Sequence, residues 1–221
     1  MSGELVGAAF CSSTRNQCYV FNKDKFVVVD YSKGVQPKNR LLNGPVQISV
    51  EFPMFDNTQF QNGIDGSFAN HLKEAFFFAG DQCAKADFAP NTVDAKLISG
   101  PMEIGAMFPS LRGTVFADGI TAAMKSSNDK NVFLFNGDQC GQLDYVSGRL
   151  VEIKSIAETF PQFLGTVFES GLDAALNTHD KNEAYVFKGE YYAHFNLTTR
   201  AFISGFIRKI RIDWPALSRI I

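Results

Sequence analysis

The residues that first suggest chemistry are cysteines, because the tetrapeptide Gly-Asp-Gln-Cys occurs twice, ending at Cys83 and Cys140. A thiol in a repeated motif could be half of a redox pair or a ligand in a metal site. The chain holds four cysteines, and neither these two nor Cys11 and Cys18 show the Cys-x-x-Cys spacing of zinc or redox motifs. They are also too few for a disulfide framework. We therefore expect four buried thiols.

A second candidate for binding chemistry is an aromatic and acidic pattern in three similar segments, TQFQNGI, TVFADGI and TVFESGL. Their phenylalanines are Phe60, Phe116 and Phe168, and two segments add an acid, Asp118 or Glu169, ahead of a glycine. Carboxylates beside aromatic faces are the groups that bind a polyamine, through ion pairs and cation–π contacts. The alternative is that the rings pack between structural units and the acids are ordinary surface charges.

Catalytic motifs are missing from the sequence. No GxSxG, HExxH, P-loop or GxGxxG pattern occurs in a suitable strand-to-helix context, so we expect a protein that is not an enzyme. The three histidines belong to no CxxCH motif. His71 lies in a turn, His194 in a strand, and His179 in a polar turn where we expect it to be exposed. A surface or dimer-interface haem site that uses one of them stays open, with no residue assigned.

Composition and charge limit the class of protein. The chain is 45% hydrophobic and 20% charged, as in soluble globular proteins. Its formal net charge of −2 provides no basic surface for nucleic acid. No apolar run approaches the roughly 20 residues that span a bilayer, and the first ten residues lack the basic start of a signal peptide. We expect a cytosolic protein without nucleic-acid or membrane partners.

The elements that would position these residues recur four times. Three markers keep the same order and repeat about every 55 residues. The small-residue stretches are VGAAF, IDGSF, ITAAM and LDAAL. The aromatic strands are CYVFNKDKF, AFFFAGDQC, VFLFNGDQC and AYVFKGEYY. The aromatic–proline pairs begin at Phe52, Phe108, Phe160 and Trp214.

Each repeat alternates like antiparallel strands separated by turn signals, and its end could be a fourth strand with a short helical turn or a helix. Small sheets repeated in this way predict an all-β, four-bladed β-propeller around a central tunnel. The expected single domain, 1–221, divides into blades at about 4–55, 56–111, 112–163 and 164–217. The small residues fit the first strand of each blade, where space near the axis is least. Gly-Asp-Gln-Cys then marks the hairpin turn between the second and third strands, and a bridge between Cys83 and Cys140 is not expected.

The small-residue inner strand, the aromatic strand before a Gly-acid turn and the terminal aromatic–proline pair resemble hemopexin repeats. The missing signal sequence and the lack of a cysteine near Pro215 make the chain similar to legume seed albumins of the albumin-2 (PA2-like) type, over about 4–217. Secreted hemopexin domains usually join the first blade to the last by a disulfide. Here packing and strand pairing would have to close the ring.

The resemblance implies a cation in the tunnel, bound through the second residue of each inner motif: Gly7, Asp65, Thr121 and Asp173. Backbone carbonyls would suit Ca²⁺ or Na⁺, and converging N–H groups at another level would suit an anion such as chloride. The alternative is that Asp65 and Asp173 only cap the channel mouth. The resemblance also implies spermine binding and, in some members, haem binding.

Together with the residue patterns, the resemblance implies a non-enzymatic seed albumin that binds small ligands, above all a polyamine such as spermine. A nutrient reservoir and a carbohydrate-binding, lectin-like module are the alternative functions. A homodimer through one exposed outer strand also fits such a fold, because unpaired sheet edges can pair with a second chain.

Overall fold

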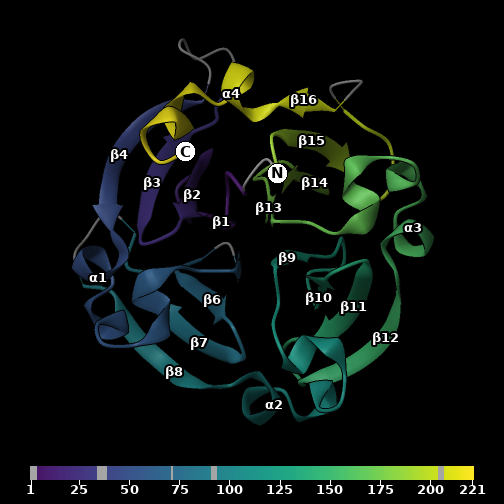
Figure 1. Ribbon diagram of the computed structural model, residues 1–221, viewed down its shortest axis with the longest axis horizontal. Helices are drawn as coiled ribbons and strands as arrows, with labels where there is room; N and C mark the ends of the chain where they lie inside the picture. Colours follow the sequence, from purple (N-terminus) through teal and green to yellow (C-terminus); the bar gives the residue numbers. More distant parts are fainter. Residues whose placement is uncertain (1–3, 34–38, 71, 91–93, 204–206) are drawn as a thin grey trace.

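The computed structural model describes residues 4–33, 39–70, 72–90, 94–203 and 207–221. Within them, four antiparallel sheets of four strands each stand around a common axis (Figure 1). The prediction of an all-β, four-bladed propeller is confirmed. None of the described helices is long and apolar enough to cross a membrane.

Each sheet runs in chain order from an inner to an outer strand. The first is β1 (Ala8–Cys11), β2 (Gln17–Asn22), β3 (Lys25–Asp30) and β4 (Arg40–Gln47). The second is β5 (Gly66–Ala69), β6 (Glu74–Ala79), β7 (Gln82–Asp87) and β8 (Lys96–Glu103). The third is β9 (Ala122–Lys125), β10 (Asn131–Asn136), β11 (Gln139–Asp144) and β12 (Arg149–Ser155). The fourth is β13 (Ala174–Asn177), β14 (Glu183–Lys188), β15 (Tyr191–Asn196) and β16 (Arg208–Lys209).

A short helix follows every outer strand, so the ambiguous end of each repeat holds both a strand and a helical turn. These helices are α1 (Ile48–Glu51), α2 (Ile104–Met107), α3 (Ile156–Thr159) and α4 (Ile210–Asp213). The aromatic–proline pair ends each helix, because proline cannot donate a backbone hydrogen bond and instead begins a 3₁₀ turn. These turns are η1 (Pro53–Phe55), η3 (Pro109–Leu111), η5 (Pro161–Phe163) and η7 (Pro215–Arg219). Further 3₁₀ turns, η2 (Gln59–Asn62), η4 (Val115–Ala117) and η6 (Val167–Ser170), lead to the next inner strand.

The inner strands β1, β5, β9 and β13 contact one another around the axis. Their small residues permit this approach: a Cβ atom at Gly66 would lie 2.6 Å from the carbonyl oxygen of Ile120 in the next blade. At the level of these strands, Phe10, Phe68 and Leu176 help to reduce the central space to a cavity of about 10 Å³. The polar ends of the axis are therefore where a ligand could enter.

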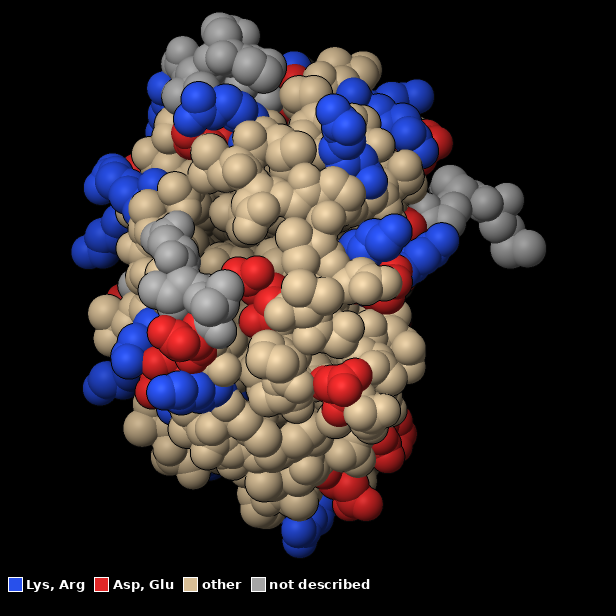
Figure 2. All heavy atoms as spheres, turned by 90° about the vertical axis from the view of Figure 1, so that its left-hand side faces the viewer, with Lys and Arg blue, Asp and Glu red and all other residues tan. Residues whose placement is uncertain are grey.

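Hydrophobic clusters fill the seams between neighbouring blades rather than the centre. Each cluster draws side chains from two adjacent blades, and the cluster that joins the fourth blade to the first includes Trp214 and Leu217. All four cysteines are buried and free, as expected. On the side of the molecule that carries β4 and α1, basic and acidic side chains are interspersed, with no continuous basic surface (Figure 2).

Candidate binding site at the mouth of the central axis

Polar groups from several blades meet at the end of the axis where the inner strands begin. Asp65, Thr121 and Asp173, which directly precede β5, β9 and β13, line one pocket of about 300 Å³. Glu4, which precedes β1, and Lys188, at the end of β14, line the same pocket. The structure thus brings three of the four predicted cation-binding residues together and adds two charged residues to them.

The hairpin turns of the second and fourth blades hold two of these carboxylates in place. Asp65 Oδ2 accepts a hydrogen bond from the backbone N–H of Gly80 at 2.7 Å, and Asp173 Oδ2 accepts one from Gly189 at 2.6 Å. Both glycines are left-handed, with φ of 51° and 54°, a conformation that glycine adopts without strain. One oxygen of each aspartate thus accepts a hydrogen bond within its own blade, and the other oxygen can contact a cation.

The first and third blades place no carboxylate at the equivalent position. Thr121 Oγ1 instead donates to the carbonyl of Leu172 at 2.9 Å, which ties the third blade to the fourth. At Gly7, a Cβ atom would lie 2.9 Å from Glu4 Oε1, so a larger residue would displace the Glu4 carboxylate. Glu4 therefore supplies the acid that the first inner strand lacks.

The carboxylates influence one another electrostatically. Although Glu4 as a residue is exposed, desolvation of its carboxyl group raises its pKa to about 7, and the charges of Asp173 and Asp65 add to the rise while Lys188 opposes it. Lys188 Nζ lies 3.0 Å from Asp173 Oδ1. Asp65 and Asp173 against Lys188 leave one excess negative charge in the pocket, and ionised Glu4 adds a second, so the pocket attracts cations.

Sequence reasoning missed Glu4 and Lys188. Glu4 stands before the first recognisable marker, so no repeat pattern indicates it. Lys188 could have been found from hairpin register, because Ala174 pairs with Phe187 across β13 and β14. Continuing this register by one residue pairs Asp173 with Lys188, and opposite charges on neighbouring strands attract.

The phenylalanines expected beside the entrance lie in the seams instead. Phe60, Phe116 and Phe168 are all 0% exposed, and each belongs to a hydrophobic cluster between blades. A ring without an exposed face cannot stack on a ligand that arrives from solvent, so these rings follow the alternative of inter-blade packing. Asp118 is exposed, and Glu169 accepts a backbone hydrogen bond of its own turn at 2.7 Å. Neither acid lines the pocket.

The donor set at the mouth gives limited support to a metal ion. Carboxylate, hydroxyl and carbonyl oxygens are the ligand types that Ca²⁺ prefers, in sets of about six to eight. Among the described residues, however, no group of three or more His, Cys, Asp or Glu side chains could hold a metal. Side chains alone therefore do not build the predicted cation site, and ligation by backbone carbonyls stays a prediction, as does the chloride site.

The histidines offer no open haem ligand among the described residues, and His71 lies outside them. His179, expected to be exposed, is instead partly buried and engaged through both ring nitrogens. The backbone N–H of Asn16 donates to Nδ1 at 3.1 Å, so Nε2 carries the proton and donates to the carbonyl of Ser12 at 2.8 Å. His194 is 7% exposed, and its Nε2 lies 2.9 Å from Glu183 Oε2. Haem binding remains a prediction without an assigned residue.

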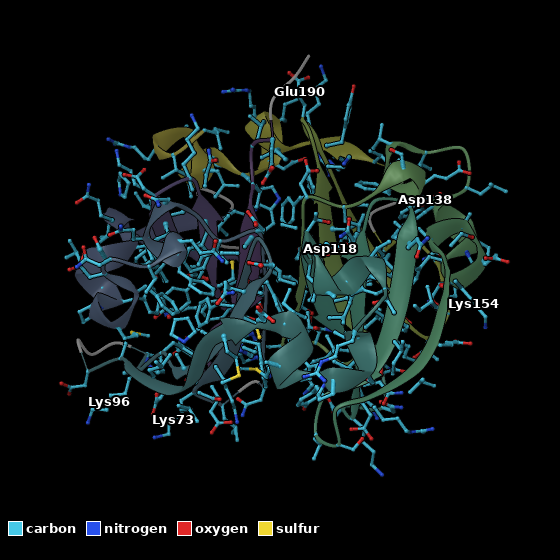
Figure 3. All side chains as sticks on the ribbon, turned by 60° about the horizontal axis from the view of Figure 1, so that its bottom comes forward. Lys73, Lys96, Asp118, Asp138, Lys154 and Glu190 are labelled. Atoms are coloured by element: carbon cyan, nitrogen blue, oxygen red, sulfur yellow. The ribbon has the colours of Figure 1, made fainter. Side chains whose placement is uncertain are left out.

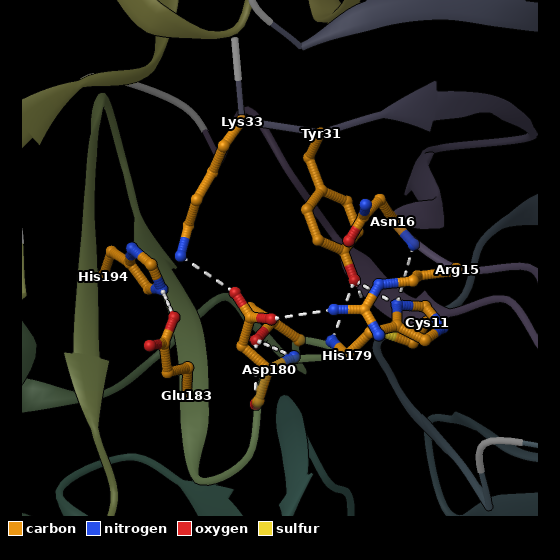
Figure 4. A network of polar contacts seen from close by, with 10 residues as sticks. Cys11, Arg15, Asn16, Tyr31, Lys33, His179, Asp180, Glu183 and His194 are labelled. Atoms are coloured by element: carbon orange, nitrogen blue, oxygen red, sulfur yellow. Dashed lines mark hydrogen bonds and ion pairs between the residues drawn. The ribbon is translucent and has the colours of Figure 1, made fainter. Parts of the chain in front are cut away.

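A separate polar network closes the seam between the first and fourth blades, at the end of the axis where β1 and β13 finish (Figure 4). The hydroxyl group of Tyr31 lies 2.5 Å from His179 Nδ1 and 3.4 Å from Cys11 Sγ. Asp180 pairs with Arg15 at 3.3 Å and with Lys33 at 2.9 Å. These contacts join the two ends of the propeller ring.

Comparisons with known proteins agree with the fold. No protein-family model matches the chain. The chain is 43% identical to Albumin-2 of Pisum sativum over 222 residues, which cover 98% of this chain and 96% of the relative. A solved structure from Cicer arietinum, described as a plant lectin with two metal-binding sites, matches with a TM-score of 0.92 and 44% identity over 98% of each chain. A hemopexin-fold protein of cow pea matches with a TM-score of 0.92 and 38% identity over 99% of each chain. The chain therefore belongs to the albumin-2 family of seed proteins, with the hemopexin-type fold.

Proposed function

We propose that this protein is a non-enzymatic seed albumin that binds a linear polyamine, such as spermine, at the acidic mouth of its central axis. The observation that carries the proposal is the convergence of Glu4, Asp65 and Asp173 on one pocket of about 300 Å³. Carboxylates drawn from three blades present separated negative charges, and a polyamine carries separated positive charges along a flexible chain. Charge-assisted hydrogen bonds between such groups are stronger than neutral ones.

A contact within the protein supports the choice of ligand. Lys188 places an alkylammonium group 3.0 Å from Asp173 Oδ1, which is the contact that one end of a polyamine would make. Asp65 forms no comparable ion pair among the described residues, and the ionised form of Glu4 is destabilised by desolvation and by its acidic neighbours. A ligand with several ammonium groups would supply the missing positive charge to both.

Isothermal titration calorimetry with spermine tests the proposal. Wild-type protein is expected to bind at low ionic strength and more weakly at high salt, because salt screens exposed charges. Asp65→Asn is expected to weaken binding by about tenfold through the loss of one charge-assisted contact. Lys188→Gln is expected to strengthen binding, because it removes the competing resident cation from Asp173.

Asp118→Asn is the matched control, since it removes the same charge from an exposed aspartate that does not line the pocket. Its affinity for spermine should equal that of wild type. Absence of binding heat from the folded wild-type protein in buffers of different ionisation enthalpy would reject the ligand and favour a nutrient-reservoir role. Equal losses in Asp65→Asn and Asp118→Asn would reject the location.

A lectin-like function is the second candidate, and it is supported by the 44% identity to a protein described as a plant lectin. Agglutination of cells requires at least two binding sites in one particle, which either the four blades of one chain or a second copy could supply. A red-cell agglutination assay with sugar inhibition tests the activity, and sedimentation analysis run beside it distinguishes the two sources. Agglutination that sugars abolish would support this candidate, and its absence at saturating protein would reject it.

A further inference from the structure

A second polar pocket, also of about 300 Å³, lies between the third and fourth blades. All of its lining residues except Arg200 belong to the third blade. Arg200 enters from the turn after β15, where the Asn196 side chain accepts backbone hydrogen bonds from Thr198 and Thr199 at 2.9 Å each. This turn holds Arg200 in a left-handed conformation, with φ of 58°. Such a backbone is costly for a residue with a side chain, so the surrounding structure fixes the arginine at this position.

Among the described residues, the guanidinium group of Arg200 has aromatic neighbours but no anionic partner. It lies 4.5 Å from the ring centroid of Phe160 and 6.0 Å from that of Phe133. Its Nη1 atom is buried without a hydrogen-bond acceptor, and no carboxylate of the described residues pairs with it. Ring faces attract the positive charge, but they accept none of the five N–H groups in the guanidinium plane. Burial lowers the pKa of Arg200, which agrees with a cation that lacks compensation.

The acidic residues near the pocket already have partners of their own. Glu152 Oε2 lies 2.6 Å from Lys154 Nζ, and Figure 3 shows Lys154 at the outer edge of the third blade. Glu158 Oε2 accepts hydrogen bonds from the backbone N–H and the hydroxyl group of Ser155, at 2.9 and 2.7 Å. These contacts engage both carboxylates away from Arg200, and within the described part of the pocket neither of them forms an ion pair with it.

We propose that this pocket binds a small oxyanion, a carboxylate or a phosphate, through the guanidinium group of Arg200. A planar guanidinium can donate two parallel hydrogen bonds to either anion. Ser127 and Gln142 also line the pocket, and their hydroxyl and amide groups are further donors of the kind an oxyanion requires. The competing interpretation is that Arg200 only joins the two blades by stacking on Phe160.

The test is an NMR titration of the full chain, with inorganic phosphate and succinate added separately to a buffer that contains neither. The arginine Nε–H resonances are followed, and Arg200 is identified by the signal missing from Arg200→Lys. A saturable shift of the Arg200 resonance is expected with at least one anion, and comparison of the two titrations distinguishes phosphate from carboxylate. Arg200→Lys retains the charge but loses the planar fork, so calorimetry of the better anion should show affinity lower by about tenfold.

Arg112 is the internal control, because it is exposed and its Nε already donates to the carbonyl of Gly105 at 2.7 Å. Shifts that do not saturate, or that affect Arg112 and Arg200 in parallel, would identify an adventitious ion only and overturn the proposal. An Arg200 resonance that does not move with either anion would also overturn it and leave the stacking role. The wild-type shifts decide the question even where Arg200→Lys melts at a lower temperature.

Discussion

The carboxyl group of Glu4 acts in opposite directions on stability and on cation binding. Its pKa rises from 4.5 to about 7 on folding. Because the folded state holds this proton more tightly than the unfolded state, the stability that the group contributes is present below pH 4.5 and is lost as pH rises through about 7. The negative charge that appears over the same range faces the pocket shared with Asp65 and Asp173. A bound polyamine would stabilise that charge.

The first prediction therefore concerns the pH dependence of spermine affinity. Raising the pH from about 6 to about 7.5 should tighten binding about fivefold, because Glu4 becomes ionised while amines of ordinary pKa stay charged. Glu4→Gln should lose most of this dependence, and Asp118→Asn should retain it. Calorimetry at matched ionic strength measures the change. Parallel pH profiles for wild type and Glu4→Gln would contradict the assignment of the titrating group.

Among the structural elements, the hairpin turns between the second and third strands repeat one backbone conformation in all four blades. The residue that opens each turn has φ between 51° and 56°. These residues are Lys23, Gly80, Gly137 and Gly189. The next residue in each turn accepts a backbone hydrogen bond at 2.8 or 2.9 Å from the first isoleucine of the following short helix. The turn thus anchors the helix that leads to the next blade, and in the first blade it does so with a lysine in a conformation that favours glycine.

The second prediction follows from this exception. Lys23→Gly should raise the free energy of unfolding by about 1 kcal/mol, because relief of left-handed strain exceeds the entropy that glycine adds to the unfolded chain. Gly137→Ala should lower it by a similar amount, since the added Cβ atom has no neighbour within 4 Å and backbone strain is the main change. Urea unfolding monitored by tryptophan fluorescence measures both. Changes of the same sign in the two variants would refute the strain argument.

The repeated elements were predictable from sequence because their signals are local. The Gly-Asp-Gln-Cys turn, the small inner strands and the helix-ending aromatic–proline pairs each follow from neighbouring residues. The binding mouth was only partly predictable: Asp65, Thr121 and Asp173 lie where the repeats place them, whereas Glu4 precedes every repeat marker. The sequence could not show whether Phe60 is buried or lies at the entrance of the axis, because the aromatic and polar residues of its segment fit both positions. Such differences depend on how blades pack, which a local pattern does not encode.

At the scale of the whole molecule, the ring is closed by side chains from its two ends. The cysteines form no disulfide, and the C-terminal turn η7 packs against β3 and β4 of the first blade. The side-chain amides of Asn22 and Asn39 donate to the carbonyls of Ile220 and Asp213. Together with Trp214, which is fully buried in the seam, these contacts fasten the last blade to the first. Loss of a seam contact should therefore affect the cooperative stability of all four blades.

The third prediction tests this seam through Tyr31, whose hydroxyl group accepts a hydrogen bond from the backbone N–H of His179 at 3.2 Å and also contacts His179 Nδ1. Tyr31→Phe should lower the free energy of unfolding by about 1–3 kcal/mol, the usual cost of depriving buried polar groups of a partner. Tyr145→Phe is the matched control, because that hydroxyl donates to the carbonyl of Asp129 within the third blade at 3.0 Å, and its loss should cost less.

The same seam should depend on pH through His179. Burial lowers the pKa of His179, so its neutral imidazole accepts the hydrogen bonds at Nδ1. The free energy of unfolding should therefore fall as pH drops below 6.5, the pKa of the unfolded histidine. Tyr31→Phe should weaken that acid dependence, whereas Tyr145→Phe should leave it unchanged. Urea titrations of both variants at neutral and mildly acidic pH measure the difference, and equal behaviour of the two would show that the Tyr31 contact does not hold the ring closed.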